Sequence, residues 1–325
     1  MMRRREMEKK VLVVIPVQER HKEKLEKAGK GCRFIYSSPT EVEESVIADA
    51  EFIIGNVPAE KIRASNRLEF LQLNSAGADP YVIPGILSDG TILTNATGAY
   101  SKAVAEHMFG MMFMLQKKLH LYRDAQARTE WTDEGTVVSI TDATVLVVGL
   151  GDIGLHFARM AKALGAYTLG IKRRKCECPD GVDELYTTEQ LDEVLPRADV
   201  IVSFLPGTKE THHIYTKERF ALMKKQAIFL NGGRGSAVDT DLLYEVLKNH
   251  QIMAAGIDVT DPEPLPAEHP LWKQDNVMIT PHISGQYHLP ETFERIVDIA
   301  AENLEAYLNG RSLRNVVDFA TGYKK

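Results

Sequence analysis

Residues 144–154 read Thr-Val-Leu-Val-Val-Gly-Leu-Gly-Asp-Ile-Gly, an apolar run that ends in a glycine-rich turn. An amphipathic segment, Ile153 to Leu164, follows the turn. In a strand–turn–helix unit, glycines allow close approach of the backbone to a pyrophosphate, whose charge is favoured at a helix N-terminus. Taken alone, the stretch leaves open another nucleotide or a purely structural turn. It favours a dinucleotide, with contacts expected from Gly149, Gly151, Asp152, Ile153 and Gly154.

Short apolar runs alternate with helical patterns on both sides of this turn, as expected for parallel strands joined by helices. Strands are predicted upstream at 11–17, 33–36, 52–55, 70–73 and 92–93, and downstream at 144–149, 167–171, 200–204, 227–231, 251–258 and 277–279. Helices are predicted at 19–30, 153–164, 188–195, 217–224, 240–248 and 290–308. The segment Ser101 to Ala127 is apolar on most turns, which predicts one long buried helix that bridges two domains.

The predicted fold class is α/β, with two doubly wound parallel-sheet domains. A Rossmann cofactor domain, residues 101–286, is expected to be inserted into a flavodoxin-like substrate domain made of residues 1–100 and 287–325. The helix at 290–308 follows the last strand and could pack on the first domain.

The composition is that of a globular protein, and the 325 residues suffice for two domains. A net charge of -6 gives no general attraction to nucleic acid or to anionic membranes. Three cysteines cannot form a closed disulfide framework, which favours a reducing compartment. Cys176 and Cys178 lack a partner pair at ligand spacing, so no metal site is expected. The charged segment Met1 to Lys10 precedes an apolar run that is too short for a signal peptide, and the expected location is the cytoplasm.

Three polar residues downstream of the turn each lie in a distinctive frame. Arg234 lies in Asn-Gly-Gly-Arg-Gly at 231–235, Glu263 in Asp-Val-Thr-Asp-Pro-Glu-Pro at 258–264, and His282 in Thr-Pro-His-Ile at 280–283. Separately, each has a simpler explanation: a surface cation beside a glycine turn, an exposed loop carboxylate, and a residue at a strand end. In this order, they indicate a hydride-transfer site. Other histidines, His107, His156, His212 and His213 among them, have no such frame and are expected to be structural or solvent-facing.

The end of the second strand of the nucleotide-binding unit reads Gly-Ile-Lys-Arg-Arg-Lys at 170–175. A carboxylate here would accept a hydrogen bond from the ribose 2′-hydroxyl, whereas Lys172 and Arg173 would attract a 2′-phosphate. NADP is therefore expected more than NAD, with a solvated basic loop as the alternative. Pro206, after the strand at 200–204, is also expected to contact the cofactor.

The chain resembles the D-isomer-specific 2-hydroxyacid dehydrogenase family over essentially its whole length. First-domain signatures add to the frames above: Leu-Asn-Ser-Ala-Gly-Ala-Asp at 73–79, Thr-Asn-Ala-Thr-Gly-Ala-Tyr at 94–100, and Ala-Glu-His at 105–107. Two departures from the family pattern are Thr260-Asp261, where a more hydrophobic residue often follows Asp-Val, and Ser284, where alanine is frequent.

The resemblance implies roles for individual residues. The guanidinium fork of Arg234 would bind the substrate carboxylate and polarise the 2-oxo group, and the amides of Ser75, Ala76 and Gly77 would also hold the carboxylate. His282 would protonate the ketone oxygen, and Glu263 would pair with its imidazole. Asp258 resembles the residue that contacts the nicotinamide carboxamide. Closure of a cleft between the domains would complete the site.

The expected function is reduction of a small 2-oxo acid, of the glyoxylate or hydroxypyruvate kind, to the R (D) 2-hydroxy acid by NAD(P)H. Alternatives are a phosphoglycerate dehydrogenase-like enzyme and a non-catalytic, corepressor-like protein that senses NAD(H). Formate dehydrogenases resemble the chain too, but they carry glutamine in place of Glu263. A homodimer is expected; the methionine-rich face Met108 to Met114 would suit either a subunit interface or an internal core.

Overall fold

The computed structural model describes residues 8–63, 65–320 and 323–324. Residues 1–7 of the charged N-terminal segment therefore lie outside the described residues. The chain divides into two compact units, one made of Met1–Tyr100 and Tyr287–Lys325, the other of Ser101–Gln286. Each unit is built on a parallel sheet, so the predicted α/β class with two doubly wound domains is confirmed.

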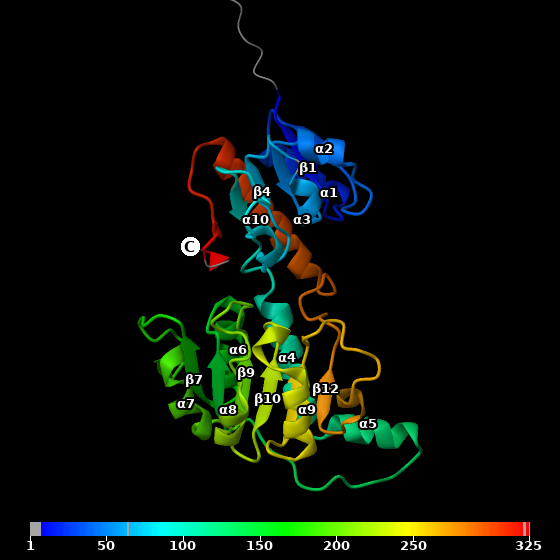
Figure 1. Cartoon of the computed structure of the whole chain (residues 1–325), viewed down its shortest axis with the longest axis vertical. Helices are drawn as coiled ribbons and strands as arrows, with labels where there is room; N and C mark the ends of the chain where they lie inside the picture. The colour runs from blue at the N-terminus through cyan, green and yellow to red at the C-terminus, as the bar shows by residue number, and fades with distance from the viewer. Residues whose placement is uncertain (1–7, 64, 321–322, 325) are drawn as a thin grey trace, which may run out of the picture. The chain divides into compact units, whose positions relative to one another are not determined.

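The first unit holds a five-stranded parallel sheet in the order β2-β1-β3-β4-β5. Strands β1 and β4 of this sheet are labelled in Figure 1. Its strands are β1 Lys10–Val13, β2 Arg33–Tyr36, β3 Phe52–Ile54, β4 Phe70–Gln72 and β5 Ile92–Thr94. This 2-1-3-4-5 order is that of flavodoxin-like sheets. Apolar side chains fill both faces of this sheet; Leu12, Ile53 and Leu71 are fully buried.

The helices of the first unit are α1 Glu19–Ala28, α2 Glu44–Asp49, α3 Ala59–Ile62 and α10 Pro290–Leu308, with a 3-10 turn at Asp79–Tyr81. Helix α10 packs against α1 although the 261 residues 29–289 lie between the two helices in the sequence. His21 Nε2 lies 3.0 Å from Glu294 Oε1 across this contact. The unit ends in a small antiparallel pair, β13 Val317–Asp318 and β14 Tyr323–Lys324.

The second unit holds a seven-stranded parallel sheet in the order β12-β11-β10-β9-β6-β7-β8. Its strands are β6 Thr144–Val148, β7 Tyr167–Lys172, β8 Glu184–Thr187, β9 Val200–Ser203, β10 Ile228–Asn231, β11 Ala254–Ile257 and β12 Val277–Ile279. When these strands are numbered 1 to 7 along the chain and read from β8, their order is 3-2-1-4-5-6-7. Its first six strands have the Rossmann arrangement. The winding reverses beside β6, and the glycine-rich turn follows this strand.

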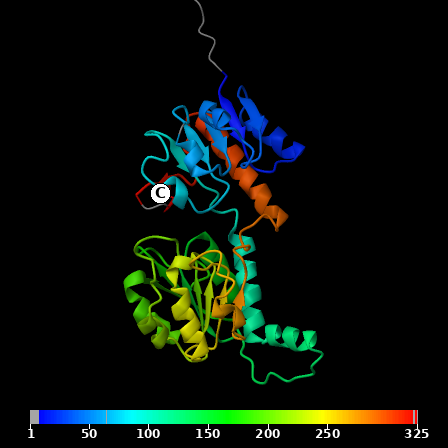
Figure 2. The same cartoon turned by 45° about the vertical axis from the view of Figure 1, so that its right-hand side comes forward.

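Helices cover both faces of this sheet: α8 and α9 lie on one face and α4 on the other (Figures 1 and 2). The helices of the unit are α4 Ser101–Gln116, α5 Leu119–Ala127, α6 Asp152–Ala163, α7 Leu191–Val194, α8 Lys217–Leu222 and α9 Thr240–Lys248. Short 3-10 turns lie at Thr188–Gln190, Leu195–Arg197, Gly235–Ala237 and Pro270–Lys273.

The long helix expected over Ser101 to Ala127 is two helices, so that prediction was wrong. Lys118 adopts a left-handed conformation, with φ 55°, between α4 and α5. The apolar spacing runs across the break because Leu115 and Leu119 keep the helical repeat. Burial nevertheless changes there, since α4 buries most of its length while α5 buries only Ala125.

The methionine-rich face belongs to the internal core of the second unit. Met108, Met111 and Met112 are buried, and α4 packs on α6, β10 and β11. This face therefore contributes intramolecular packing, and it gives no support to a subunit interface.

Strand β8 and helices α2 and α3 were not predicted from the sequence. β8 reads Glu-Leu-Tyr-Thr, is half-buried and lies at a sheet edge, so its alternation is weak. The helix expected at 188–195 is observed as the 3-10 turn Thr188–Gln190, the short helix α7 Leu191–Val194 and the 3-10 turn Leu195–Arg197. Pro196, which has no amide hydrogen to donate, lies in the last of these turns. Several strands also end earlier than expected, as at Val13 in β1.

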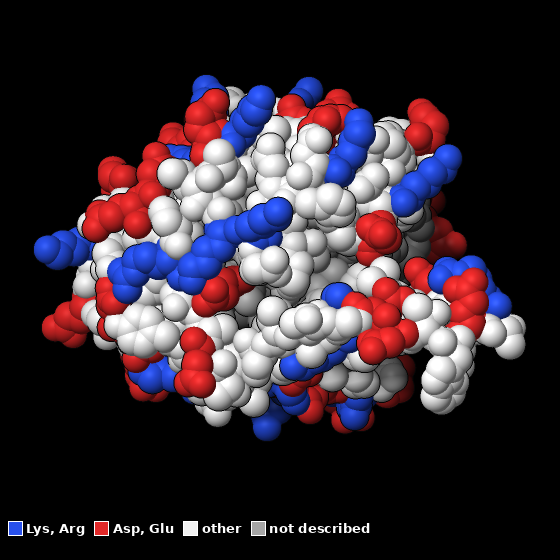
Figure 3. All heavy atoms as spheres, turned by 90° about the horizontal axis from the view of Figure 1, so that it is seen from below, with Lys and Arg blue, Asp and Glu red and all other residues white. Residues whose placement is uncertain are grey.

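The surface of the second unit in Figure 3 carries basic and acidic side chains side by side. Such mixing presents no broad field of a single sign on that face. Among the described helices, none has both the length and the apolar character that crossing a bilayer requires.

Candidate active site

The candidate residues of the second unit follow the carboxyl ends of its parallel strands. Gly149 follows β6, Lys172 ends β7, and Pro206 comes shortly after β9. Arg234 follows β10, Glu263 follows β11, and His282 follows β12. The carboxyl ends of parallel strands share one edge of the sheet, where ligands of open α/β folds bind.

The first and third glycines of the turn are required by packing. Gly149 has φ +93°, and a β-carbon on it would lie 2.8 Å from the carbonyl oxygen of Phe204. A β-carbon on Gly154 would lie 2.5 Å from the carbonyl oxygen of Gly149. Two hydrogen bonds, from the amides of Gly149 and Leu150 to the carbonyl of Ile171, hold the turn against β7.

Gly151 differs from its two neighbours, because a β-carbon there would meet nothing within 4 Å. It is the N-cap of α6, and no side chain caps this helix end. The first amides of a helix have no intrahelical acceptor and attract anions. The open space beside uncapped amides fits the pyrophosphate of a dinucleotide, with Asp152 and Ile153 in the first turn.

The basic end of β7 has an acidic neighbour, Glu210. Lys172 is half-buried, and its Nζ lies 3.7 Å from Cys176 Sγ, while Arg173 is exposed. The pKa of the Glu210 carboxyl is lowered by its own backbone amide and the Thr208 hydroxyl, and further by the charges of Arg173 and Lys209. A 2′-phosphate near Arg173 would therefore also feel the negative charge of Glu210, which the sequence reading did not anticipate.

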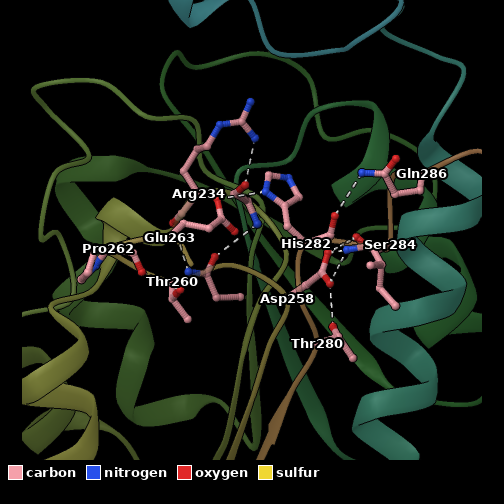
Figure 4. A network of polar contacts seen from close by, with 12 residues as sticks. Arg234, Asp258, Thr260, Pro262, Glu263, Thr280, His282, Ser284 and Gln286 are labelled. Atoms are coloured by element: carbon pink, nitrogen blue, oxygen red, sulfur yellow. Dashed lines mark hydrogen bonds and ion pairs between the residues drawn. The ribbon is translucent and has the colours of Figure 1, made fainter. Parts of the chain in front are cut away.

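Arg234 is positioned by the glycines around it. Asn231 Nδ2 donates to the Arg234 carbonyl at 3.1 Å, and the Gly233 amide donates to Asn231 Oδ1 at 3.2 Å. The stem of Arg234 lies close to the turn after β9, since a β-carbon on Gly207 would lie 3.4 Å from Arg234 Cγ. Half-buried, Arg234 directs its guanidinium group away from the sheet (Figure 4).

Gly235→Ala should destabilise the second unit strongly, because a β-carbon at this position would overlap the carbonyl group of Thr260. The neighbour is backbone, so relief requires displacement of the loop that carries Glu263. Overpacking of this kind costs about 1–3 kcal/mol, occasionally more. Chemical denaturation followed by circular dichroism measures the loss.

Gly151→Ala is the matched control, because it adds the same methyl group in open space. It should change the free energy of unfolding by less than about 1 kcal/mol, the usual cost of alanine at an N-cap, while it weakens cofactor binding. Equal destabilisation by both substitutions would contradict this account of the two glycines.

His282 and Glu263 form the central pair of the site (Figure 4). Nδ1 of His282 lies 3.1 Å from Oε2 of Glu263, and the two side chains are 45% and 42% exposed. With Nδ1 facing the carboxylate, the second ring nitrogen, Nε2, remains available to a substrate. His282 has φ +50°, and its amide donates to the Asp258 carbonyl at 2.8 Å.

A buried carboxylate, Asp258, holds the loop that carries His282. Its Oδ1 accepts hydrogen bonds from the Thr280 hydroxyl at 2.6 Å and the Ile283 amide at 3.0 Å. Its Oδ2 accepts from the amide of Ser284 at 3.1 Å and from the Ser284 hydroxyl. A carboxylate offers about four acceptor positions. Four donors of this chain therefore occupy the acceptor positions of Asp258. His107 joins the network through Thr280 Oγ1, 3.0 Å from its Nε2.

The network contains three residues to which the sequence reading gave no functional role: Thr280, Ser284 and His107. The signal for Ser284 was present, because it was noted as a departure from alanine. Its hydroxyl supplies one of the hydrogen bonds to Asp258, a bond that alanine could not make. No signal in the sequence links His107 to Asp258, which lies 151 residues further along the chain.

Ser75, Ala76 and Gly77 lie in the first unit, in a loop after β4. A reciprocal pair fixes this loop: the Asn56 amide donates to Asn74 Oδ1 at 2.7 Å, and the Asn74 amide donates to Asn56 Oδ1 at 3.0 Å. Among the described residues, the backbone amides of Ser75, Ala76 and Gly77 donate no hydrogen bond to the chain. Half-buried amides of this kind suit an anionic ligand.

Arg234, Glu263 and His282 therefore lie on one sheet edge of the second unit, together with the glycine turn and Asp258. Pro206 lies on the same edge, half-buried, with its carbonyl accepting from the Thr211 hydroxyl. The arrangement provides a charged fork, an imidazole paired with a carboxylate, and an uncapped helix end.

Comparison with known proteins gives a family match. Residues 109–284 match the model of the D-isomer specific 2-hydroxyacid dehydrogenase NAD binding domain. A glyoxylate reductase of Thermofilum pendens is 33% identical over 260 residues, 78% of this chain and 76% of that protein. A D-3-phosphoglycerate dehydrogenase of Methanocaldococcus jannaschii is 32% identical over 317 residues, 95% of this chain and 59% of that protein.

A solved structure of a D-isomer specific 2-hydroxyacid dehydrogenase family protein from Aeromonas salmonicida superposes with a TM-score of 0.85 at 32% identity. The match covers 96% of this chain and 99% of that one. The chain belongs to the D-isomer-specific 2-hydroxyacid dehydrogenase family of NAD(P)-dependent oxidoreductases.

Proposed function

We propose that the protein reduces a small 2-oxo acid, of the glyoxylate or hydroxypyruvate kind, to the R (D) 2-hydroxy acid. The observation that carries this proposal is the His282–Glu263 pair, 3.1 Å between Nδ1 and Oε2, on the same sheet edge as Arg234. The residues 101–286 would bind the dinucleotide, and residues 1–100 with 287–325 would form the substrate domain.

Arg234 would bind the substrate through two parallel N–H groups. One face of the guanidinium fork can serve the carboxylate and the 2-oxo oxygen together, because these oxygens are neighbours in a 2-oxo acid. The free amides of Ser75 to Gly77 would hold the carboxylate from the first unit. The reduced nicotinamide, when bound, supplies the hydride.

His282 would deliver the proton. Its Nε2 donates to the ketone oxygen as negative charge develops there, and in the reverse direction the same nitrogen accepts the proton. The carboxylate of Glu263 fixes the ring orientation through Nδ1 and stabilises the imidazolium before proton transfer. Asp258 would orient His282 by holding residues 282–284. A contact with the nicotinamide carboxamide would require Asp258 to share an acceptor oxygen with the donors of residues 280–284.

NADP is proposed as the preferred cofactor, because Lys172 and Arg173 end β7 where many NAD enzymes carry an acid. Replacing both by alanine should raise the KM for NADPH about tenfold or more while changing the KM for NADH little, since only the 2′-phosphate is affected. Glu210→Gln serves as the opposite control: removal of its charge should lower the KM for NADPH. Parallel changes with both cofactors would contradict a 2′-phosphate site.

A homodimer is proposed as well, on evidence other than the methionine face. Helix α5 and the segment after it expose Leu119, Trp131 and Val137, and Trp131 is fully exposed. Contiguous exposed apolar patches mark interaction sites, and Trp131 would lie at the centre of such a patch in the proposed dimer. Light scattering should give about twice the chain mass of 36.3 kDa, and Trp131→Glu should shift the mass towards the monomer.

The cytoplasm is proposed as the compartment. Cys32, Cys176 and Cys178 are all free, and Cys176 and Cys178 are exposed. Thiols of this kind persist where the environment is reducing.

A second candidate function is oxidation of a phosphoglycerate, favoured by 32% identity across 95% of the chain to a D-3-phosphoglycerate dehydrogenase. The chain spans 59% of that relative's length. One assay distinguishes the two functions: consumption of NADPH or NADH with glyoxylate, hydroxypyruvate, pyruvate and phenylpyruvate, beside cofactor reduction with 3-phosphoglycerate. Turnover of the oxo acids alone supports the proposal, and turnover of 3-phosphoglycerate alone supports the second candidate. Cofactor binding without turnover of any acid would favour a sensor.

A further inference from the structure

Two histidines and one aspartate, none of them among the reacting residues, form a cluster. His212 and His213 lie in the segment between β9 and α8, and Asp261 lies in the loop after β11. One ligand atom from each side chain lies within 4.8 Å of the other two. Imidazole nitrogens and carboxylate oxygens are the ligands that Zn²⁺ and its neighbours in the transition series take from proteins.

The two histidine rings face the same region because of the local backbone. Adjacent side chains of an extended chain point to opposite sides. His213 instead adopts a left-handed conformation, with φ 48°, and its ring stacks on that of His212 with centroids 3.9 Å apart and planes at 28°. Among the described residues, neither ring nor the Asp261 carboxylate has a hydrogen-bond partner. All three side chains are thus available as ligands.

The backbone around the cluster is fixed. The His213 amide donates to the Ser236 carbonyl at 2.8 Å. Asp261 is held on both sides of its peptide by Thr240, whose hydroxyl donates to the Asp261 carbonyl at 2.7 Å and accepts from the Asp261 amide at 3.2 Å. Tetrahedral ligands about 2 Å from zinc lie about 3.3 Å apart. Reaching this spacing requires rotation of side chains with the backbone in place; those of His212 and Asp261 are exposed, and that of His213 is half-buried.

We propose that His212, His213 and Asp261 bind a divalent transition-metal cation of the zinc class. Two imidazoles and one carboxylate favour Zn²⁺ over Mg²⁺ or Ca²⁺, which prefer oxygen ligands. Because His212 and Asp261 are exposed, the fourth position is open to water. The cation ties the segment after β9 to the loop that carries Glu263, two residues beyond Asp261. The sequence alone predicts no metal site, because Cys176 and Cys178 have no matching Cys or His pair at ligand spacing, and it assigns both histidines a structural or solvent-facing role.

Titration calorimetry with Zn²⁺ on untagged, chelator-treated protein tests the site. The wild type should bind one Zn²⁺ per chain, and Co²⁺ in its place should give a visible absorption spectrum. His212→Asn and Asp261→Asn should each weaken Zn²⁺ binding about tenfold or more, because each removes one of three ligands. Saturating Zn²⁺ should raise the Tm of the wild type by about 5 °C and that of these variants by much less.

His250→Asn is the matched control, because His250 is also an exposed histidine of the second unit and has φ 50°. It should bind Zn²⁺ as the wild type does. No Zn²⁺ binding by the wild type, or equal affinity in His212→Asn and His250→Asn, would overturn the proposal. Circular dichroism of each variant verifies the fold, and none of these readouts depends on the proposed reductase activity.

Discussion

Arg234→Ala should lower kcat/KM for a 2-oxo acid about a thousandfold. The substitution removes both N–H groups of the fork, which together contribute about 4 kcal/mol to binding and polarising the substrate in the transition state. Both kcat and KM should change, because the carboxylate is bound in the ground state while the 2-oxo oxygen gains charge only as the hydride arrives. Steady-state kinetics with glyoxylate or hydroxypyruvate measures both parameters.

Arg234→Lys is the control that separates charge from geometry. Lysine keeps the positive charge but presents a point donor instead of a planar fork. It should recover only a small part of the lost kcat/KM. Cofactor affinity should stay near that of the wild type in both variants, because the glycine turn and β7 do not involve Arg234. Full activity in Arg234→Lys would show that the fork geometry is unimportant.

His282→Asn should lower kcat about 10²- to 10⁴-fold with little change in KM, because it removes the proton donor. Asparagine is the suitable substitution, since His282 has φ +50° and asparagine tolerates the left-handed region better than most residues. The loop held by Asp258 should therefore keep its conformation. Single-turnover kinetics reports the chemical step separately from product release.

Glu263→Gln should have a smaller effect, about tenfold on kcat, because an amide oxygen can still accept from His282 Nδ1 while it lacks the charge that stabilises an imidazolium. A larger loss in Glu263→Gln than in His282→Asn would contradict the division of roles between proton donor and orienting carboxylate.

Local patterns with a strong physical signature were predictable from the sequence. The glycine turn after an apolar strand predicted the Rossmann unit. Helices α9 and α10 have their expected bounds, Thr240–Lys248 and Pro290–Leu308. Their helical periodicity is clear, and a proline stands at the first helical position of α10. The sequence frames around Arg234, Glu263 and His282 indicated hydride-transfer chemistry because of their residue types. Arg234 supplies a charged fork, His282 a proton donor and Glu263 the carboxylate that pairs with it.

Features that depend on tertiary contacts were not predictable. The break at Lys118 preserves the helical spacing of apolar residues, so periodicity could not reveal it. The four hydrogen bonds to Asp258 come from residues 280–284 and depend on how β11 and β12 pair. The convergence of His212, His213 and Asp261 likewise requires a left-handed backbone conformation at His213, which is uncommon for residues other than glycine.

The most direct test of the central claim is the product formed from hydroxypyruvate. NADPH or NADH oxidation is followed by absorbance, and the glycerate formed is resolved by chiral chromatography. The account predicts one glycerate per cofactor oxidised, with the R (D) enantiomer in large excess, and formation of glycerate about a thousandfold more slowly with Arg234→Ala. The S enantiomer, a racemic product, or cofactor binding with no reduction of any 2-oxo acid would contradict the account.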